Sequence, residues 1–384
     1  MTGAQSLLIR LLRDHINRRP TEGAGGDELH GLAVLAAIHG LSGFVTAQLG
    51  DRYSGDEENV LVSSLGSCAA EYVRRRENYE ELKNAFRDAG LWFIPVKGIL
   101  IAEEYPVPEL RVMGDIDIII SKDERRSVEN LLKTLGWRET SRTGDTVSYE
   151  NATCSVDVKA AGSSDTGIKE PPEGSAGESI PDRNEHLVYL IAHLANHIKE
   201  TGCGIRQFLD LAVFLKTGGT DGERVRDLIE NRGFSTFAAY AFGLTEKWFG
   251  TPAPYSAGET DPEVSGRLGD EVMSGGVFGR QNSENGLLFS AKNASDGAGP
   301  VRIFFRRLFP PYRQMRLFGY CGWLNGRPYL LPVAWIVRLF RCVFTRSPAE
   351  SLRTAAEPFR YRNEIGKRAG YLEKLGIPLD REFF

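Results

Sequence analysis

The stretch that decides the fold is Gly114-Asp115-Ile116-Asp117-Ile118-Ile119-Ile120, in which two acidic residues stand within a run of isoleucines. Side chains alternate along a strand, so Asp115 and Asp117 leave one face while the intervening isoleucines enter the core. Aspartate is depleted in strands and costly to bury without a partner. The pair therefore predicts a cation site, for which carboxylate oxygens suit Mg²⁺, or else an edge strand with two solvated carboxylates.

A short apolar segment and a glycine turn precede the acidic pair. Leu91 to Val96 predicts a strand, and after Lys97 a helix is expected to begin near Gly98. A helix N-terminus leaves backbone N–H groups free and favours anions. A turn that binds phosphate, followed by carboxylates that bind a metal, is the combination that transfer of a nucleotidyl group requires.

The order strand, glycine turn, helix and Asp-x-Asp strand resembles the polymerase-β-like nucleotidyltransferase superfamily. Within it, PVKGILIAEEYPVPELRVMGDIDIII at 95–120 looks like the branch of uncharacterised nucleotidyltransferases. The superfamily pattern implies a third acidic residue on a later strand, and Asp157 in the alternating segment Cys154-Ser155-Val156-Asp157-Val158-Lys159 matches it. The resemblance implies that Asp115, Asp117 and Asp157 hold Mg²⁺ or Mn²⁺ and carry the reaction, with an NTP, expected to be ATP, as the substrate.

The same resemblance suggests four residues that bind the nucleotide. Gly98 allows the backbone to approach the phosphates, and Lys97 and Arg111 are candidates to neutralise phosphate charge. Further along, a helix that contains Arg206 and Asp210 resembles a second signature of the branch. Arg206 either pairs with Asp210 four residues later or contacts the nucleotide while Asp210 holds it.

The turn departs from the superfamily pattern in one respect. The superfamily usually carries Gly-Gly or Gly-Ser at this turn, whereas this chain has Lys97-Gly98, and sixteen residues separate Gly98 from Asp115. The branch shares the lysine substitution. The three carboxylates are present, so the enzyme interpretation is kept.

Composition narrows the class of protein. The chain has 384 residues, 41% hydrophobic and 26% charged, which suits one large core or two domains. Five scattered cysteines, with no Cys-x-x-Cys pair and no secretory leader, predict reduced thiols and a cytoplasmic protein. No apolar run reaches the roughly 20 residues of a membrane-spanning helix.

We expect an α+β fold: a small mixed β-sheet nucleotidyltransferase core flanked by an N-terminal helical segment and a C-terminal, mainly helical domain. The expected boundaries are 1–58 for the N-terminal helices, 59–161 for the core, 162–181 for a Gly-, Ser- and Pro-rich linker, and 182–384 for the helical domain.

Three further segments attract attention. His193 and His197 have metal-like spacing on one helical face, but a zinc protease needs Glu where Leu194 stands, so packed histidines are favoured. AIHGLSGFVTAQL at 37–49 and GGVFGRQNSENG at 275–286 resemble further pieces of the branch. The sequence assigns helical support to the former and no role to the latter.

The segment 302–346 contains nine arginines, many aromatic residues, and no Lys, Asp or Glu. Since it contributes +9 to a net charge of −4, the rest of the chain carries −13. The favoured interpretation is a pair of helices that pack their aromatic faces on the core. The alternatives are contact with an anionic membrane, with Trp335, Phe340 and Phe344 turned towards it, or binding of single-stranded nucleic acid, for which there is no strong case.

The sequence therefore predicts a Mg-dependent nucleotidyltransferase that moves a nucleoside monophosphate from an NTP onto a hydroxyl of a small molecule, sugar or protein. The alternative is a non-catalytic, nucleotide-binding regulator or interaction protein on the same fold.

Overall fold

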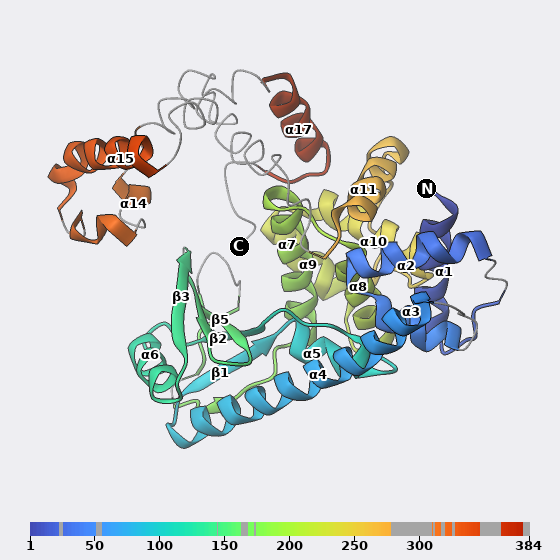
Figure 1. Cartoon of the computed structure of the whole chain (residues 1–384), viewed down its shortest axis with the longest axis horizontal. Helices are drawn as coiled ribbons and strands as arrows, with labels where there is room; N and C mark the ends of the chain where they lie inside the picture. Colours follow the sequence, from blue (N-terminus) through green and yellow to red (C-terminus); the bar gives the residue numbers. More distant parts are fainter. Residues whose placement is uncertain are drawn as a thin grey trace. The chain divides into compact units, whose positions relative to one another are not determined.

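The computed structural model describes residues 1–22, 26–50, 56–143, 145–162, 168–172, 174–277, 309, 312–315, 319–324, 327–345 and 362–378. The chain forms two compact units, one made chiefly of residues 1–280 and the other chiefly of residues 281–381. The predicted α+β fold is confirmed, since a six-stranded mixed sheet is joined to helices that precede and follow it (Figure 1). The domain boundaries at 58, 161 and 181 stay predictions.

The sheet has the strand order β3-β4-β5-β2-β1-β6. Its strands are β1 (Trp92–Val96), β2 (Ile116–Ile120), β3 (Arg138–Thr143), β4 (Thr146–Glu150), β5 (Ser155–Ala160) and β6 (Gly177–Glu178). The central strand β2 runs antiparallel to β1 and parallel to β5. Strands β4 and β5 form an antiparallel hairpin, and β6 was missed inside the segment expected to be a linker.

The helices of the first unit are α1 (Gly3–Ile16), α2 (Gly26–His39), α3 (Ser42–Leu49), α4 (Asp56–Asp88), α5 (Gly98–Ala102), α6 (Arg125–Thr134), α7 (Arg183–Glu200), α8 (Ile205–Thr217), α9 (Gly222–Arg232), α10 (Ser235–Phe249) and α11 (Pro262–Gly275). A single 3₁₀ turn, η2 (Pro108–Leu110), lies between α5 and β2. Helix α11 was not predicted, because its own glycines and the Gly- and Pro-rich flanks obscure the helical repeat. Asp261 caps it by accepting a hydrogen bond from the Glu263 N–H at 2.8 Å.

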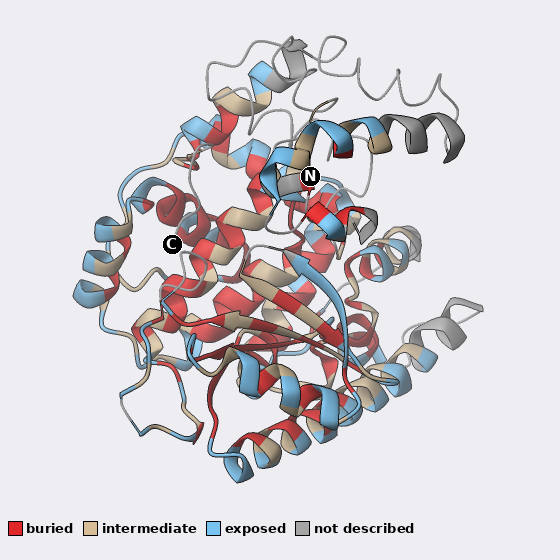
Figure 2. Ribbon diagram, turned by 90° about the vertical axis from the view of Figure 1, so that its left-hand side faces the viewer, coloured by how far each residue is buried: buried red, intermediate tan, exposed pale blue. Residues whose placement is uncertain are grey.

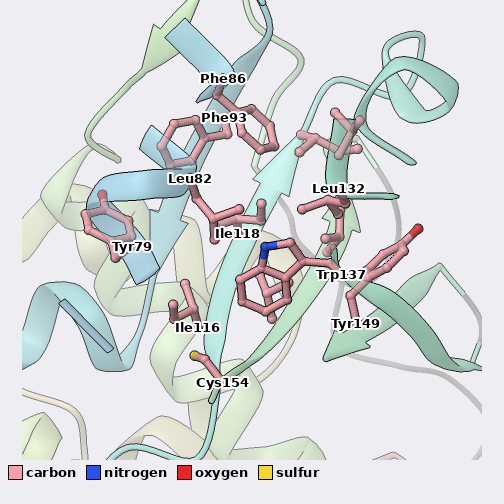
Figure 3. Close-up of a cluster of buried hydrophobic side chains, with 14 of the residues drawn as sticks. Tyr79, Leu82, Phe86, Phe93, Ile116, Ile118, Leu132, Trp137, Tyr149 and Cys154 are labelled. Carbon is pink, nitrogen blue, oxygen red and sulfur yellow. The ribbon is translucent and has the colours of Figure 1, made fainter. Parts of the chain in front are cut away.

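One face of the sheet is apolar and is covered by α4 and α6. Figure 3 shows Leu82 and Phe86 of α4 meeting Phe93 and Ile118 of the sheet, with Leu132 of α6 beside them. These side chains are at most 1% exposed. Burying each such residue contributes about 1.5–3 kcal/mol, so this face anchors the sheet. The outer side of α4 carries exposed residues (Figure 2).

The opposite face of the sheet is divided between apolar and acidic residues. Trp92, Ile94 and Ile119 form a small buried cluster with Tyr189 of α7, which therefore lies on this face. Asp117 is two residues before Ile119 and shares its face by strand alternation. The predicted alternation along β2 thus places the carboxylates on the side of the sheet that α7 covers.

The second unit contains α14 (Tyr312–Met315), η3 (Gly319–Leu324), η4 (Pro328–Leu330), α15 (Leu331–Thr345) and α17 (Arg362–Lys374). A small core joins Met315, Cys321, Leu324 and Ala334, and Trp335 packs against it. The prediction that aromatic residues of 302–346 pack inward is therefore confirmed for Trp335, while the side chains of Phe340 and Phe344 lie outside the described residues. None of the described helices combines the length and the apolarity needed to cross a bilayer.

Candidate active site

Three carboxylates converge on the sheet face that α7 covers. Asp117 of β2 and Asp157 of β5 are paired in register, and Asp115 directly precedes β2. One oxygen from each of the three lies within 4.8 Å of the others. The two central strands are parallel neighbours, so the sheet itself brings residues forty positions apart into one cluster.

The carboxylates of the cluster repel one another, and two lysines partly compensate their negative charge. The negative charge of Asp117, together with burial, raises the pKa of Asp115 to about 6. Burial acts in the same direction on the pKa of Asp117, but Lys97 and Lys159 outweigh it, so this pKa is lowered. Negative charge is thus concentrated on a site that two lysines only partly balance.

Lys97 occupies the turn between β1 and α5 in a backbone conformation that L-residues rarely adopt. Its φ is 56°, in the left-handed region, where the superfamily pattern has glycine. Two contacts hold it there: its Nζ forms an ion pair with Asp117, and its backbone N–H donates to His186 Nε2 at 3.2 Å. Non-glycine residues in such conformations cost about 1–3 kcal/mol and cluster at functional sites.

The donor set fits a divalent cation. Three converging carboxylates supply only oxygen ligands, which Mg²⁺ and Mn²⁺ prefer. A cation between them would relieve the repulsion that raises the pKa of Asp115. When bound, such an ion would neutralise charge on a phosphoryl group and stabilise the entering and leaving oxygens.

Helix α7 adds residues that the sequence did not assign to the site. Lys159 Nζ lies 4.0 Å from Asp117 Oδ1 and 3.4 Å from the Tyr189 hydroxyl. The Tyr189 ring stacks on His193 with centroids 6.1 Å apart, and His193 Nε2 is hydrogen-bonded to His197 Nε2 at 2.8 Å. The four-residue spacing of Tyr189, His193 and His197 was the available signal, because it places all three on one side of the helix.

The histidines of this pair are neutral and hydrogen-bonded to each other. Burial, followed by the charge of Lys97, lowers the pKa of His197 to about 4 and lowers that of His193. One ring donates to the other, which a doubly protonated pair cannot do. The preference for packed histidines over a metal site stays a prediction.

Arg111 lies against the turn at Gly98, and Asp210 of α8 binds its guanidinium. Its Nε and Nη2 donate to the two oxygens of Asp210 at 3.1 and 2.7 Å, and the Tyr105 hydroxyl donates to Asp210 Oδ1 at 2.7 Å. A Cβ on Gly98 would lie 2.7 Å from Arg111 Nη1. Glycine is therefore required here by the arginine, a reason the sequence analysis did not foresee.

Arg206 does not form the suggested ion pair with Asp210, because Arg111 already occupies both carboxylate oxygens. Instead, Arg206 Nη1 donates to the backbone oxygen of Val112 at 2.9 Å. Burial and the neighbouring charge of Arg111 lower the pKa of Arg206, while Asp115 is among the groups that raise it. In the described part of the chain no carboxylate forms an ion pair with this guanidinium.

The histidine–glycine segment and the segment at 275–286 meet at one junction. His39 Nε2 is hydrogen-bonded to the Met273 backbone oxygen at 3.2 Å. A Cβ on Gly204, which precedes α8, would lie 2.1 Å from the backbone oxygen of Gly276. These glycines thus allow three segments to approach closely at the start of the helix that carries Arg206. Residues 278–286 lie outside the described residues.

Comparison with protein families matches residues 27–250 to the family described as "Uncharacterised nucleotidyltransferase". The chain belongs to this family. No curated protein and no solved structure matches it. All three carboxylates of this chain lie within the residues that match the family.

The predicted site residues fall into two groups. Lys97 joins the cluster of Asp115, Asp117 and Asp157 directly, through its ion pair with Asp117. Gly98, Arg111 and Arg206 form a neighbouring group around the turn and the start of α8. Their roles in catalysis and nucleotide binding stay predictions.

Proposed function

We propose that the protein transfers a nucleoside monophosphate from an NTP to a hydroxyl group of a small molecule, sugar or protein. The convergence of Asp115, Asp117 and Asp157 supports this function, since three carboxylates this close together offer the oxygen ligands that a divalent cation prefers. Membership of a nucleotidyltransferase family supports it independently.

The reaction balances as a single displacement. The acceptor oxygen forms a bond to the α-phosphorus while the bond from that phosphorus to the bridging oxygen breaks, and pyrophosphate leaves. Asp157 completes the cation site and takes the proton of the acceptor hydroxyl, the role that the superfamily pattern implies for the third carboxylate. Asp115 and Asp117 hold the cation, Mg²⁺ or Mn²⁺, and ATP is the expected donor.

Arg206 supplies the contact to the triphosphate. Its guanidinium is partly buried and forms no ion pair with a carboxylate of the described residues, so it attracts an anion, and phosphate suits its planar donors. Burial and the charge of Arg111 lower the pKa of Arg206, and the charges of Asp210 and Asp115 oppose this shift, so the guanidinium lies within electrostatic reach of the cluster. Arg111, whose charge Asp210 already balances, serves mainly to hold the turn at Gly98.

Labelled NTPs test the proposal. Purified protein with Mg²⁺ and each α-³²P-labelled NTP is expected to release pyrophosphate and to pass label to an acceptor supplied in a cell extract. Asp115→Asn and Asp157→Asn should abolish transfer, whereas Asp123→Asn, a change in the loop after β2, should not. Transfer that persists in both cluster variants would exclude this site.

One observation favours the non-catalytic alternative. The Lys97 side chain already neutralises Asp117, and this lysine stands where the superfamily pattern has glycine. A regulator that binds a nucleotide without turnover would show saturable NTP binding by calorimetry, no pyrophosphate release, and loss of binding in Arg206→Gln.

A further inference from the structure

Helix α15 exposes an apolar side that no described residue of the second unit covers. Val333 is 47% exposed and Ile336 is 54% exposed, while Ala334 on the opposite side is buried in the small core. Tyr329, just before the helix, is 74% exposed, and Trp323 is 37% exposed. Exposed apolar patches of this kind mark interaction surfaces.

Val333 and Ile336 are three positions apart, so they lie on the same side of α15. Their exposure places this side away from the small core that contains Ala334. We call Val333 and Ile336 the α15 stripe.

The charge around the α15 stripe has one sign. The segment 302–346 carries nine arginines and no acidic residue, and Arg327, Arg338 and Arg341 are close to the stripe in the sequence. An apolar helix face with arginines beside it is the pattern of a helix that lies in the plane of an anionic membrane surface. Tyr329 and Trp323 suit the same place, because their rings combine an apolar body with a polar atom.

We propose that the α15 stripe and its arginines bind an anionic lipid surface. The helix lies parallel to the bilayer with Val333 and Ile336 in the acyl region and the arginines at the phosphate groups. An acidic surface of another protein would satisfy the arginines but not the exposed apolar side chains of Val333 and Ile336. This inference does not depend on nucleotidyl transfer.

The structure also changes which residue tests the idea. Trp335, which the membrane alternative turned towards the lipid, packs against the core of the second unit, and its ring meets Phe309 with centroids 5.3 Å apart. Its substitution would disturb folding. Val333 and Ile336 are the informative positions, because their exposed side chains can be changed without opening that core.

Co-sedimentation of the full chain with vesicles tests the proposal. We expect the wild-type chain to pellet at low salt with vesicles of phosphatidylcholine and phosphatidylglycerol in equal parts, and not with pure phosphatidylcholine. Val333→Asp combined with Ile336→Asp should lower the bound fraction about tenfold. Val73→Asp is the matched control, since Val73 is 51% exposed on α4 of the other unit.

Three outcomes would overturn the proposal. The wild-type chain could stay in the supernatant with anionic vesicles, or the double variant could pellet as well as the wild type. Light scattering could also show a dimer that the double variant loses, without any vesicle binding, which would make the stripe an interface between copies. If circular dichroism shows that the double variant is unfolded, Val333→Ser with Ile336→Ser replaces it and must show the same loss.

Discussion

Two buried ion pairs lie within this site and differ in how fully the carboxylate is satisfied. Asp210 and Arg111 are 10% and 8% exposed, and Asp117 and Lys97 are 4% and 14% exposed. Asp210 accepts three hydrogen bonds, two from Arg111 and one from Tyr105. Asp117 instead has a lysine and lies beside two further carboxylates.

This difference indicates that the Asp210 pair stabilises the fold, whereas Asp117 remains able to bind a ligand. The planar fork of an arginine matches a carboxylate and leaves it little capacity for a new ligand, whereas a lysine is a mobile point charge that a cation can replace. Asp210 therefore joins α8 to the loop before β2. Asp117 keeps a negative environment that is suited to binding and reaction.

We expect the largest effect from Asp117→Asn, which should reduce nucleotidyl transfer. Loss of a carboxylate from the cluster removes several kcal/mol of transition-state stabilisation, and we expect activity to fall on the order of 10³-fold. Thermal unfolding should change little, because Asp115 and Asp157 still offset the lysines. Pyrophosphate release and differential scanning fluorimetry measure the two quantities. A large loss of stability would show that Asp117 is structural like Asp210.

Asp210→Asn should show the reverse pattern. It leaves Arg111 buried without its carboxylate, which costs about 3–5 kcal/mol of unfolding free energy. Urea denaturation measures this loss, and Asp227→Asn on the exposed side of α9 is the control. If stability is unchanged while transfer is lost, Asp210 belongs to the chemistry and the contrast between the two pairs fails.

Arg206→Gln tests a cation that forms an ion pair with no carboxylate in the part of the chain that the structure describes. A hydrogen bond to a charged group contributes about 1.5–3 kcal/mol, so nucleotide affinity should fall at least about tenfold. Unfolding free energy should stay constant or rise, since a poorly compensated charge leaves the interior. Isothermal titration calorimetry provides the affinity, with Arg224→Gln on α9 as control. Unchanged affinity would remove Arg206 from the nucleotide site.

Gly98→Ala tests whether the two ion pairs are linked through the turn. Its Cβ would lie 2.7 Å from Arg111 Nη1, so Arg111 must shift, and the cost is about 1–3 kcal/mol. Gly114→Ala is the matched control, because a Cβ there meets nothing within 4 Å. Equal unfolding free energies of the two variants would show that Arg111 can shift without cost and does not stabilise the turn.

Much of the site could be predicted because its signals are local. Alternation along β2 predicted Asp115 and Asp117 on one face, and the superfamily pattern implied Asp157 on a later strand, which the structure pairs with β2. The partner of Asp210 could not be predicted, because residues four apart on a helix favoured Arg206. Arg111, ninety-nine positions away, forms the pair since η2 and α8 come together only in the folded chain.

The sequence by itself determined β1, β2 and β5 and the shared face of Asp115 and Asp117, since these depend on the two-residue repeat of a strand. The family resemblance came from the order of the motifs along the chain. Only the tertiary structure decided that Lys97 neutralises Asp117, that α7 covers the site with Tyr189 and His193, and that Gly98 makes room for Arg111. Each of these contacts joins segments far apart in sequence. Their energies depend on burial and distance, which no local pattern specifies.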